Sequence, residues 1–265
     1  MPHANPLAGR GILVTRPAAQ AENLCRLIEA AGGHALRLPL LSIEAITDSA
    51  TAAEALSHPE LWNWILFTSA NAVHCAAPWI RHWTSRPAVG AIGKATADKL
   101  GEQGIRVDLV PELEFNSESL LALPQMADLT GQKILIVRGQ GGREHLATTL
   151  TARGGTVRHA EVYRRIKPHI EDRLWQQYWQ DGHIHAVILT SGEAFDHLHA
   201  GLGNLTDEWA RSIPLVVIGD RIRQMARERG WQRVLSAPSA TDQALLEATI
   251  TLFEPGLQGI TPHII

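Results

Sequence analysis

The sequence predicts an α/β protein made of two similar domains, each a doubly wound parallel β-sheet with helices on both faces. Two observations support this prediction. Short apolar runs, typical of buried strands, alternate with helical patterns along the whole chain. In addition, residues 133–165 align without a gap to the segment 122 positions earlier, so that Ile134 corresponds to Ile12. We therefore expect a tandem duplication of four strand–helix units.

The repeat begins with an apolar run at 134–137, which is followed by a glycine-rich loop at 139–142. A helical pattern then ends at the glycine pair 154–155, as the first copy ends at 32–33. This order predicts a strand, a tight loop and a helix that stops at glycine. The predicted strands along the chain are 11–15, 64–67, 89–92 and 107–110, then 134–137, 186–189 and 215–218.

Two extended segments complete the repeat. Residues 36–46 contain Pro39 and alternate poorly, so we expect an edge strand or a connector there. Residues 157–166 occupy the matching position in the second copy. We therefore expect the two segments to play the same part in the two halves of the chain.

Length, charge and cysteine content narrow the class of protein. The chain has 265 residues and a formal net charge of −3, which suits two small domains and gives no basic surface for nucleic acid. We find no signal peptide and no membrane-spanning apolar run, and Cys25 and Cys75 form no disulfide framework. We therefore expect a cytoplasmic protein with two cysteines in its core.

The predicted strands end in loops of small or polar residues. In open parallel sheets, ligands bind beyond the carboxyl ends of the strands, and the helix N-termini there present unpaired N–H groups that favour anions. The candidate binding residues in these loops are Thr15, Arg16, Thr68, Ser69, Asn71, Lys94, Arg138, Gly139, Thr190, Ser191, Gly192 and Gly219. The basic residues Arg16, Lys94 and Arg138 could hold a carboxylate or phosphate. For each of them, a surface ion pair is the alternative.

Other familiar motifs are incomplete. The glycine-rich loop follows a strand, but Glu144 stands where a dinucleotide-binding loop needs its third glycine. The GKAT loop lacks the upstream glycine of a phosphate-binding P-loop. The pairs His183/His185 and His197/His199 have no third metal ligand and are expected at the surface. We therefore expect no nucleotide cofactor and no metal.

Tyr163 is one of only two tyrosines and lies near the end of the extended segment 157–166. A hydroxyl group there could give or accept a proton, or orient a leaving group. The alternative is an amphipathic residue that packs between the domains with its hydroxyl hydrated. The residues alone leave both interpretations open.

A set of short motifs occurs in a fixed order along the chain. The motifs are VTRP, TSANAV, GKATA, a strand followed by RGxGGRExL, GGxVxxAEVYRR, LTSGEAF and SAPSATDQALL. Their order and spacing, together with the EVYRR segment, resemble the uroporphyrinogen-III synthase family over nearly the whole chain. No single motif is specific, so the resemblance depends on the set.

The resemblance implies a particular division of the chain. It implies two α/β domains joined by a two-stranded connector ladder, with the ligand in the cleft between them. The first strand–helix unit then packs with the second half of the chain. Domain 1 would comprise 1–37 and 171–265, domain 2 would comprise 48–160, and the connectors would be 38–47 and 161–170.

The resemblance also implies an enzyme without a cofactor, which closes the polycarboxylate hydroxymethylbilane to uroporphyrinogen III with inversion of the last pyrrole ring and loss of water. Tyr163 matches the tyrosine proposed to assist loss of the hydroxyl group, and Thr96 matches the threonine of a GxxTA motif. Both are expected to assist without being essential. Ser69 and residues 190–192 match cleft-lining positions. Ile222 stands opposite Thr96 in the repeat, so a second threonine is missing.

The partners follow from the same resemblance. We expect a monomer that acts on a small-molecule tetrapyrrole polycarboxylate, without a nucleic-acid or membrane partner. The competing hypothesis is a non-catalytic two-domain module that binds a small anion, as duplicated α/β binding proteins do.

Overall fold

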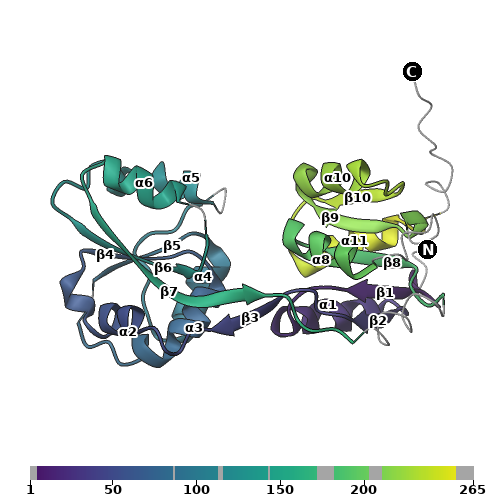
Figure 1. Cartoon of the computed structure of the whole chain (residues 1–265), viewed down its shortest axis with the longest axis horizontal. Helices are drawn as coiled ribbons and strands as arrows, with labels where there is room; N and C mark the ends of the chain where they lie inside the picture. Colours follow the sequence, from purple (N-terminus) through teal and green to yellow (C-terminus); the bar gives the residue numbers. More distant parts are fainter. Residues whose placement is uncertain are drawn as a thin grey trace, which may run out of the picture. The chain divides into compact units, whose positions relative to one another are not determined.

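The computed structural model describes residues 5–85, 87–112, 116–142, 144–171, 182–202 and 211–254. The chain divides into two compact units, of which unit 1 comprises Met1–Ser42 with Ile166–Ile265 and unit 2 comprises Ile43–Arg165. Among the described residues, each unit holds one five-stranded sheet with helices packed on it (Figure 1). The predicted α/β class with two sheets is therefore confirmed.

The sheet of unit 1 brings together strands from both ends of the chain. Its strands are β1 (Gly11–Val14), β2 (His34–Arg37), β8 (Ala186–Leu189), β9 (Leu215–Ile218) and β10 (Val234–Ala237). Their order is β10-β9-β8-β1-β2, and all four neighbouring pairs are parallel. The purple strands β1 and β2 therefore share a sheet with the green strand β8 (Figure 1). In chain order this is 2-1-3-4-5, so the winding reverses between β1 and β8.

Four strands of the unit 2 sheet have an equivalent order, and the strand that comes first in the chain lies at the edge. Its strands are β3 (Ser42–Ala45), β4 (Trp64–Phe67), β5 (Ala88–Ala91), β6 (Lys133–Gly139) and β7 (Thr156–Ile166). Their order is β3-β7-β6-β4-β5, and β4 pairs in parallel with both β5 and β6, as β6 does with β7. The winding here reverses between β4 and β6.

The predicted strand at 107–110 is wrong in the described structure, because only Leu109 pairs, through an isolated bridge to Gly90. The side chain of Asp108 explains the difference. Its Oδ2 accepts the backbone N–H of Val89 at 3.0 Å, and so takes the place of a carbonyl group in the ladder. The edge of the sheet therefore ends without another regular strand at this point.

The segment 36–46 contains edge strands, as expected. Its first residues belong to β2, in which His34 lies opposite Gly11 in a parallel pairing. Pro39 follows β2 and has no N–H group for a ladder, and β3 starts only at Ser42. The segment therefore contributes two short strands, one to each sheet.

The helices begin close to the strand ends. They are α1 (Ala18–Ala30), α2 (Ala50–Ser57), α3 (Ala70–Ile80), α4 (Lys94–Glu102), α5 (Ser117–Leu121), α6 (His145–Ala152), α8 (Gly192–Leu202), α10 (Gly219–Glu228) and α11 (Asp242–Thr251), with 3₁₀ turns at Pro59–Leu61 and Pro124–Met126. Ser69 and Thr241 cap α3 and α11, since their hydroxyl oxygens accept N–H groups three residues on. Such a cap contributes about 1 kcal/mol. No helix in the described part of the chain could span a membrane.

The central strands of each sheet are buried on both faces. In β1, Leu13 faces one apolar cluster and Ile12 and Val14 face the other. Strand β8 alternates in the same way. This arrangement explains why the strands are nearly continuous apolar runs, as in parallel sheets generally.

The two cysteines behave as the sequence predicts. Cys25 and Cys75 are free and buried in the apolar clusters of unit 1 and unit 2 respectively. Burial raises the pKa of both thiols, which keeps them protonated at neutral pH. Buried thiols of this kind are inert.

The start of β1 gives a stability prediction. A Cβ atom on Gly11 would lie 1.9 Å from the carbonyl oxygen of His183 and 3.3 Å from a side-chain carbon of Leu36, and the backbone carbonyl can move little. We expect Gly11→Ala to lower the free energy of unfolding by roughly 1–3 kcal/mol or more, measured by urea denaturation. Gly101→Ala is the control, because its Cβ would meet nothing within 4 Å and alanine favours α4. Equal midpoints for the two variants would contradict the packing of β1.

Candidate functional site

Most of the predicted site residues lie at the two places where the winding of a sheet reverses, whereas Lys94 and Thr96 follow β5 and Gly219 follows β9. Thr15 and Arg16 follow β1, and residues 190–192 follow β8, its neighbour in unit 1. Thr68 and Ser69 follow β4, and Gly139 ends β6, its neighbour in unit 2. These carboxyl edges are where open α/β sheets bind ligands.

Tyr163 is placed by an irregularity in the pairing of β6 with β7. Arg138 lies opposite Glu161, but Gly139 lies opposite Tyr163, so the register shifts by one residue. The backbone carbonyl of Tyr163 accepts the N–H of Gln140 at 2.8 Å. Such a bulge re-aims a side chain at the end of a strand.

The ring of Tyr163 lies directly against Gly139. A Cβ atom on Gly139 would be 2.5 Å from two ring carbons and 2.9 Å from the hydroxyl oxygen, so only glycine leaves room for the ring. Tyr163 is 3% exposed and belongs to the apolar cluster that contains Val137 and Phe67. The ring therefore packs inside unit 2.

The hydroxyl group of Tyr163 lies 3.2 Å from Oγ of Ser69, and either atom could be the donor. The same Oγ accepts the N–H of Ala72 at 3.1 Å and so caps α3. Ser69 thus joins the start of α3 to the tyrosine hydroxyl. The arrangement can hold one phenolic proton in a fixed direction at the edge of the core, and a catalytic role for Tyr163 stays a prediction.

The residues of the α3 and α4 loops differ in their surroundings. Thr96 is 4% exposed, and its backbone N–H donates to the carbonyl of Gly93 at 3.1 Å, in the first turn of α4. Lys94 is exposed and contacts both carboxylate oxygens of Asp98 at 2.8 and 2.9 Å. Lys94 therefore has the surface ion pair that was its alternative. Asn71 lies half-buried in the first turn of α3.

Arg138 lies beneath the glycine-rich loop. Its side chain is 5% exposed, with Nη1 3.0 Å from Oε1 of Glu144 and Nε donating to the carbonyl of Gly139 at 3.3 Å. A Cβ atom on Gly142 would come within 2.5 Å of Nη2, which has no partner among the described residues. The loop needs glycine at 142 so that it can pass over the guanidinium group.

Two threonines cross-link the central strands. Oγ1 of Thr15 donates to the carbonyl of Ile188 at 2.7 Å, across the β1/β8 pair. Oγ1 of Thr68 donates to the carbonyl of Val137 at 3.3 Å, across the β4/β6 pair. Both hydroxyl protons are donated within the protein, so these threonines fix the strand ends. A ligand could only donate a hydrogen bond to their Oγ1 atoms.

Arg16 has partners in distant parts of unit 1. Its Nη1 lies 2.6 Å from Oδ1 of Asp242, and Nδ2 of Asn23 donates to Oδ2 of the same carboxylate at 2.7 Å. Neither Asn23 nor Asp242 is among the site residues predicted from the sequence. The SATDQALL motif contains Asp242, but only as the start of a helix.

The loops after β8 and β9 are built around small residues. Oγ of Ser191 accepts the N–H of Ala194 at 3.1 Å at the start of α8, and Thr190 is half-buried beside it. Gly192 is buried. Gly219 has φ +73°, a conformation that favours glycine, and starts α10. Ile222 packs in the apolar cluster of unit 1, which explains an isoleucine in place of a second threonine.

One histidine of each pair contacts the backbone. Nδ1 of His185 accepts the N–H of Gly11 at 3.0 Å, and Nδ1 of His197 lies 2.6 Å from the carbonyl of Leu40. Both histidines are partly exposed, and each contacts the backbone. Among the described residues, no group of three or more His, Cys, Asp or Glu could hold a metal ion.

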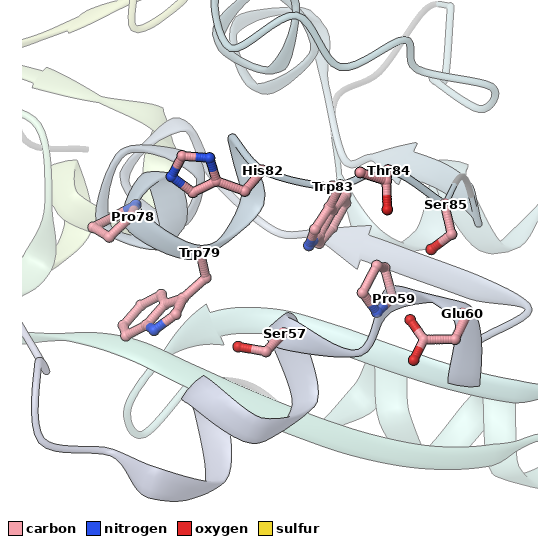
Figure 2. Close-up of a pocket in the computed structure, with 9 residues that line it drawn as sticks. All are labelled: Ser57, Pro59, Glu60, Pro78, Trp79, His82, Trp83, Thr84 and Ser85. Atoms are coloured by element: carbon pink, nitrogen blue, oxygen red, sulfur yellow. The ribbon is translucent and has the colours of Figure 1, made fainter.

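A pocket of about 250 Å³ lies elsewhere in unit 2 (Figure 2). It is lined by Ser57, Pro59, Glu60, Pro78, Trp79, His82, Trp83, Thr84 and Ser85. These residues surround the C-terminal end of α3 and the turn before β4, so the pocket is at the amino end of that strand. It contains none of the predicted site residues.

Comparison with known proteins decides the family. Residues 22–247 match the family model described as uroporphyrinogen-III synthase HemD. The chain belongs to the uroporphyrinogen-III synthase family. Its relatives include the uroporphyrinogen-III synthases of Salmonella typhimurium, 34% identical over 249 residues, and of Escherichia coli, 33% identical over 245 residues. Each alignment covers 89% of this chain and 98% of the relative.

Solved structures of uroporphyrinogen-III synthases share the fold. The enzyme of Thermus thermophilus matches with a TM-score of 0.60 at 16% identity, over 92% of this chain and 98% of that one. The enzyme of Helicobacter pylori also gives 0.60, at 17% identity, over 92% and 99%. The family resemblance found in the sequence is confirmed, and membership of this synthase family favours an enzyme of porphyrin biosynthesis over a binding module.

The contact between Tyr163 and Gly139 gives a prediction for this synthase family member. We expect Gly139→Ala to destabilise the protein by roughly 1–3 kcal/mol in urea denaturation, because the new Cβ displaces the ring. In a Tyr163→Ala background the same change should cost much less, since the ring is absent. Equal costs in the two backgrounds would show that the ring does not lie on Gly139.

Proposed function

We propose that the chain closes hydroxymethylbilane to uroporphyrinogen III, with inversion of the last pyrrole ring and loss of water. The observation that carries this proposal is the family match over residues 22–247, which spans both units. We further propose that it acts as a cytoplasmic monomer without a cofactor, and without a nucleic-acid or membrane partner.

The strand-end loops suit a polycarboxylate substrate. Helix α3 starts three residues after β4, and α8 starts three residues after β8. The first N–H groups of such helices lack intrahelical partners and carry partial positive charge, so they can hold carboxylates even in a slightly acidic protein. The residues proposed to line the substrate site are Thr15, Arg16, Thr68, Ser69, Asn71, Lys94, Arg138, Gly139, Thr190, Ser191, Gly192 and Gly219. Because Lys94, Arg138 and Arg16 already have acidic partners, we expect backbone N–H groups to carry much of the binding.

The proposed reaction needs few catalytic side chains. The terminal hydroxymethyl group must lose its oxygen as water, which needs one proton and leaves an azafulvene cation. We propose that the hydroxyl of Tyr163, oriented by Ser69, assists that proton transfer. The protein must also hold the linear tetrapyrrole substrate folded, so that its last pyrrole ring reacts at the carbon atom that leads to ring inversion. Thr96 assists in this scheme without being essential.

We also propose that the two units arose by tandem duplication. Ile12 lies opposite Ala186 in unit 1, and Ile134 lies opposite Trp64 in unit 2. Both pairs follow the 122-residue offset of the sequence repeat, so the central strands have equivalent registers. This agreement supports a common origin.

Contacts between the two proposed connectors support the proposed domain division. The proposed domains are 1–37 with 171–265, and 48–160, connected by 38–47 and 161–170. The N–H of Ile46 donates to the carbonyl of Val162 at 2.9 Å, and Arg164 Nη2 lies 2.6 Å from Glu44 Oε1. The two proposed connectors are therefore paired with each other where these residues meet.

The proposed activity is tested with purified protein and freshly made hydroxymethylbilane. After oxidation, chromatography separates the two uroporphyrin isomers. We expect isomer III to predominate and to form faster than the uncatalysed closure. Mostly isomer I, at the rate without protein, would rule out the proposed activity.

The role of Tyr163 is tested by Tyr163→Phe, which removes the hydroxyl and keeps the ring on Gly139. We expect turnover to fall on the order of a hundredfold without being abolished, because one oriented proton donor is lost while the substrate stays reactive. Steady-state rates of isomer III formation measure the effect, with the thermal midpoint as a check on folding. Unchanged turnover would leave Tyr163 as a packing residue.

A further inference from the structure

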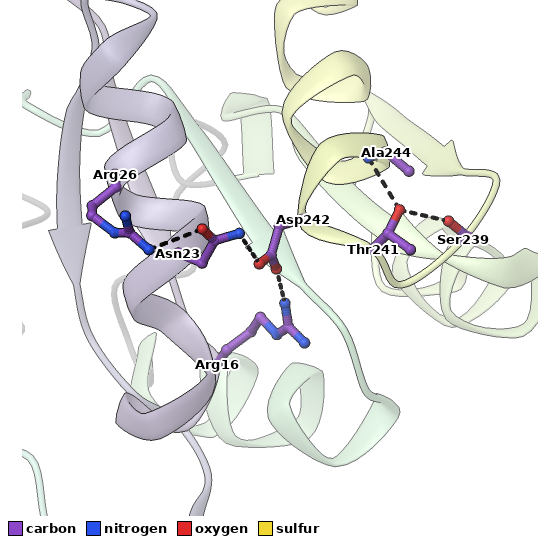
Figure 3. Close-up of polar contacts among 7 residues, drawn as sticks. All are labelled: Arg16, Asn23, Arg26, Ser239, Thr241, Asp242 and Ala244. Carbon is purple, nitrogen blue, oxygen red and sulfur yellow. Dashed lines mark hydrogen bonds and ion pairs between the residues drawn. The ribbon is translucent and has the colours of Figure 1, made fainter. Parts of the chain in front are cut away.

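Arg16, Asn23 and Asp242 form a polar cluster at the carboxyl edge of the unit 1 sheet. Figure 3 shows Arg16 and Asn23 reaching the same carboxylate from the β1 loop and from α1. Nη1 of Arg16 lies 2.6 Å from Oδ1, and Nδ2 of Asn23 lies 2.7 Å from Oδ2. Both carboxylate oxygens of Asp242 are therefore occupied.

Asp242 is itself held firmly. It is the first residue of α11, and the N-cap residue Thr241 accepts the N–H of Ala244 at 3.3 Å. A carboxylate in the first turn is stabilised by the partial positive charge of the helix N-terminus. The ion pair is also shielded, since the side chains of Arg16 and Asp242 are 14% and 22% exposed, against 72% and 59% for Lys94 and Asp98. The Arg16 pair is thus less hydrated than an ordinary surface ion pair.

The guanidinium group of Arg16 is only partly used. Its Nε atom is buried and has no hydrogen-bond partner among the described residues. In a guanidinium group, the Nε–H and one Nη2–H point in the same direction, on the side away from Nη1, and form a fork that fits the two oxygens of a carboxylate. Asp242 occupies Nη1 and leaves this fork for another anion.

We infer that Asp242, with Asn23, is a positioning residue that presets Arg16 to bind one substrate carboxylate through its Nε/Nη2 fork. This inference rests on the proposed function, which supplies the carboxylates. A free arginine side chain has many rotamers, and ordering it on binding weakens affinity. Asp242 orders Arg16 before the substrate arrives, and it does not touch the substrate.

The first test is steady-state kinetics of Asp242→Asn with hydroxymethylbilane. We expect KM to rise about 2- to 12-fold, the cost of ordering one long side chain, with kcat unchanged. Asn23→Ala, which frees one oxygen of Asp242, should raise KM by a smaller factor. Asp196→Asn is the matched control, since it breaks the Arg229–Asp196 pair of the same 2.6 Å length in unit 1 and should leave KM unchanged.

The second test separates positioning from a general structural role. In an Arg16→Gln background, Asp242→Asn should cause no further rise in KM, because the residue that it positions is gone. Arg16→Lys should not restore the wild-type KM, since an ammonium group has the charge but no fork. An equal rise in both backgrounds, or a fall in kcat with KM unchanged, would overturn the inference. Wild-type protein that makes no isomer III would instead refute the proposed function.

Discussion

Burial of both sheets on both faces constrains where this protein can place chemical groups. The interior positions of β1, β4 and β8 are filled by apolar side chains, with one cluster on each face of each sheet. Within the sheets, polar side chains can therefore gather only beyond the strand ends. The strand order reverses at the β1/β8 pair in unit 1 and at the β4/β6 pair in unit 2, so the ligand-binding edges are expected at the ends of these strands. Thr15 and Thr68 close these pairs with hydrogen bonds between neighbouring strands. The position of the candidate site follows from the way the core is built.

Most side chains at these edges already have partners inside the protein. Arg138 is held by Glu144, Arg16 by Asp242, and Ser69 by the N–H of Ala72 and the Tyr163 hydroxyl. Such groups are rigid, and rigid donors lose little freedom when a ligand binds. Preset side chains of this kind can hold a ligand in one orientation at little entropic cost.

The sequence predicted those features that depend on local patterns. Strands β4 and β8 were predicted within their observed bounds because buried parallel strands are continuous apolar runs. The segment at 107–110 is apolar apart from Asp108, and the side chain of Asp108 takes the ladder position, which no periodicity shows. The partners of Arg16 and Tyr163 also could not be predicted from the sequence. Asp242 is 226 positions from Arg16, and the aim of Tyr163 depends on a register shift that exists only when β6 pairs with β7.

We propose that the substrate binds at the carboxyl edges of the sheets through backbone N–H groups and preset side chains. The most direct measurement is a backbone amide NMR titration of the protein with uroporphyrinogen III under anaerobic conditions. We predict that the shifted amides belong to the loops after β1, β4, β6 and β8, including Arg16, Ser69 and Ser191. Shifts confined to the pocket around Trp79 and Trp83, at the amino end of β4, would contradict the account.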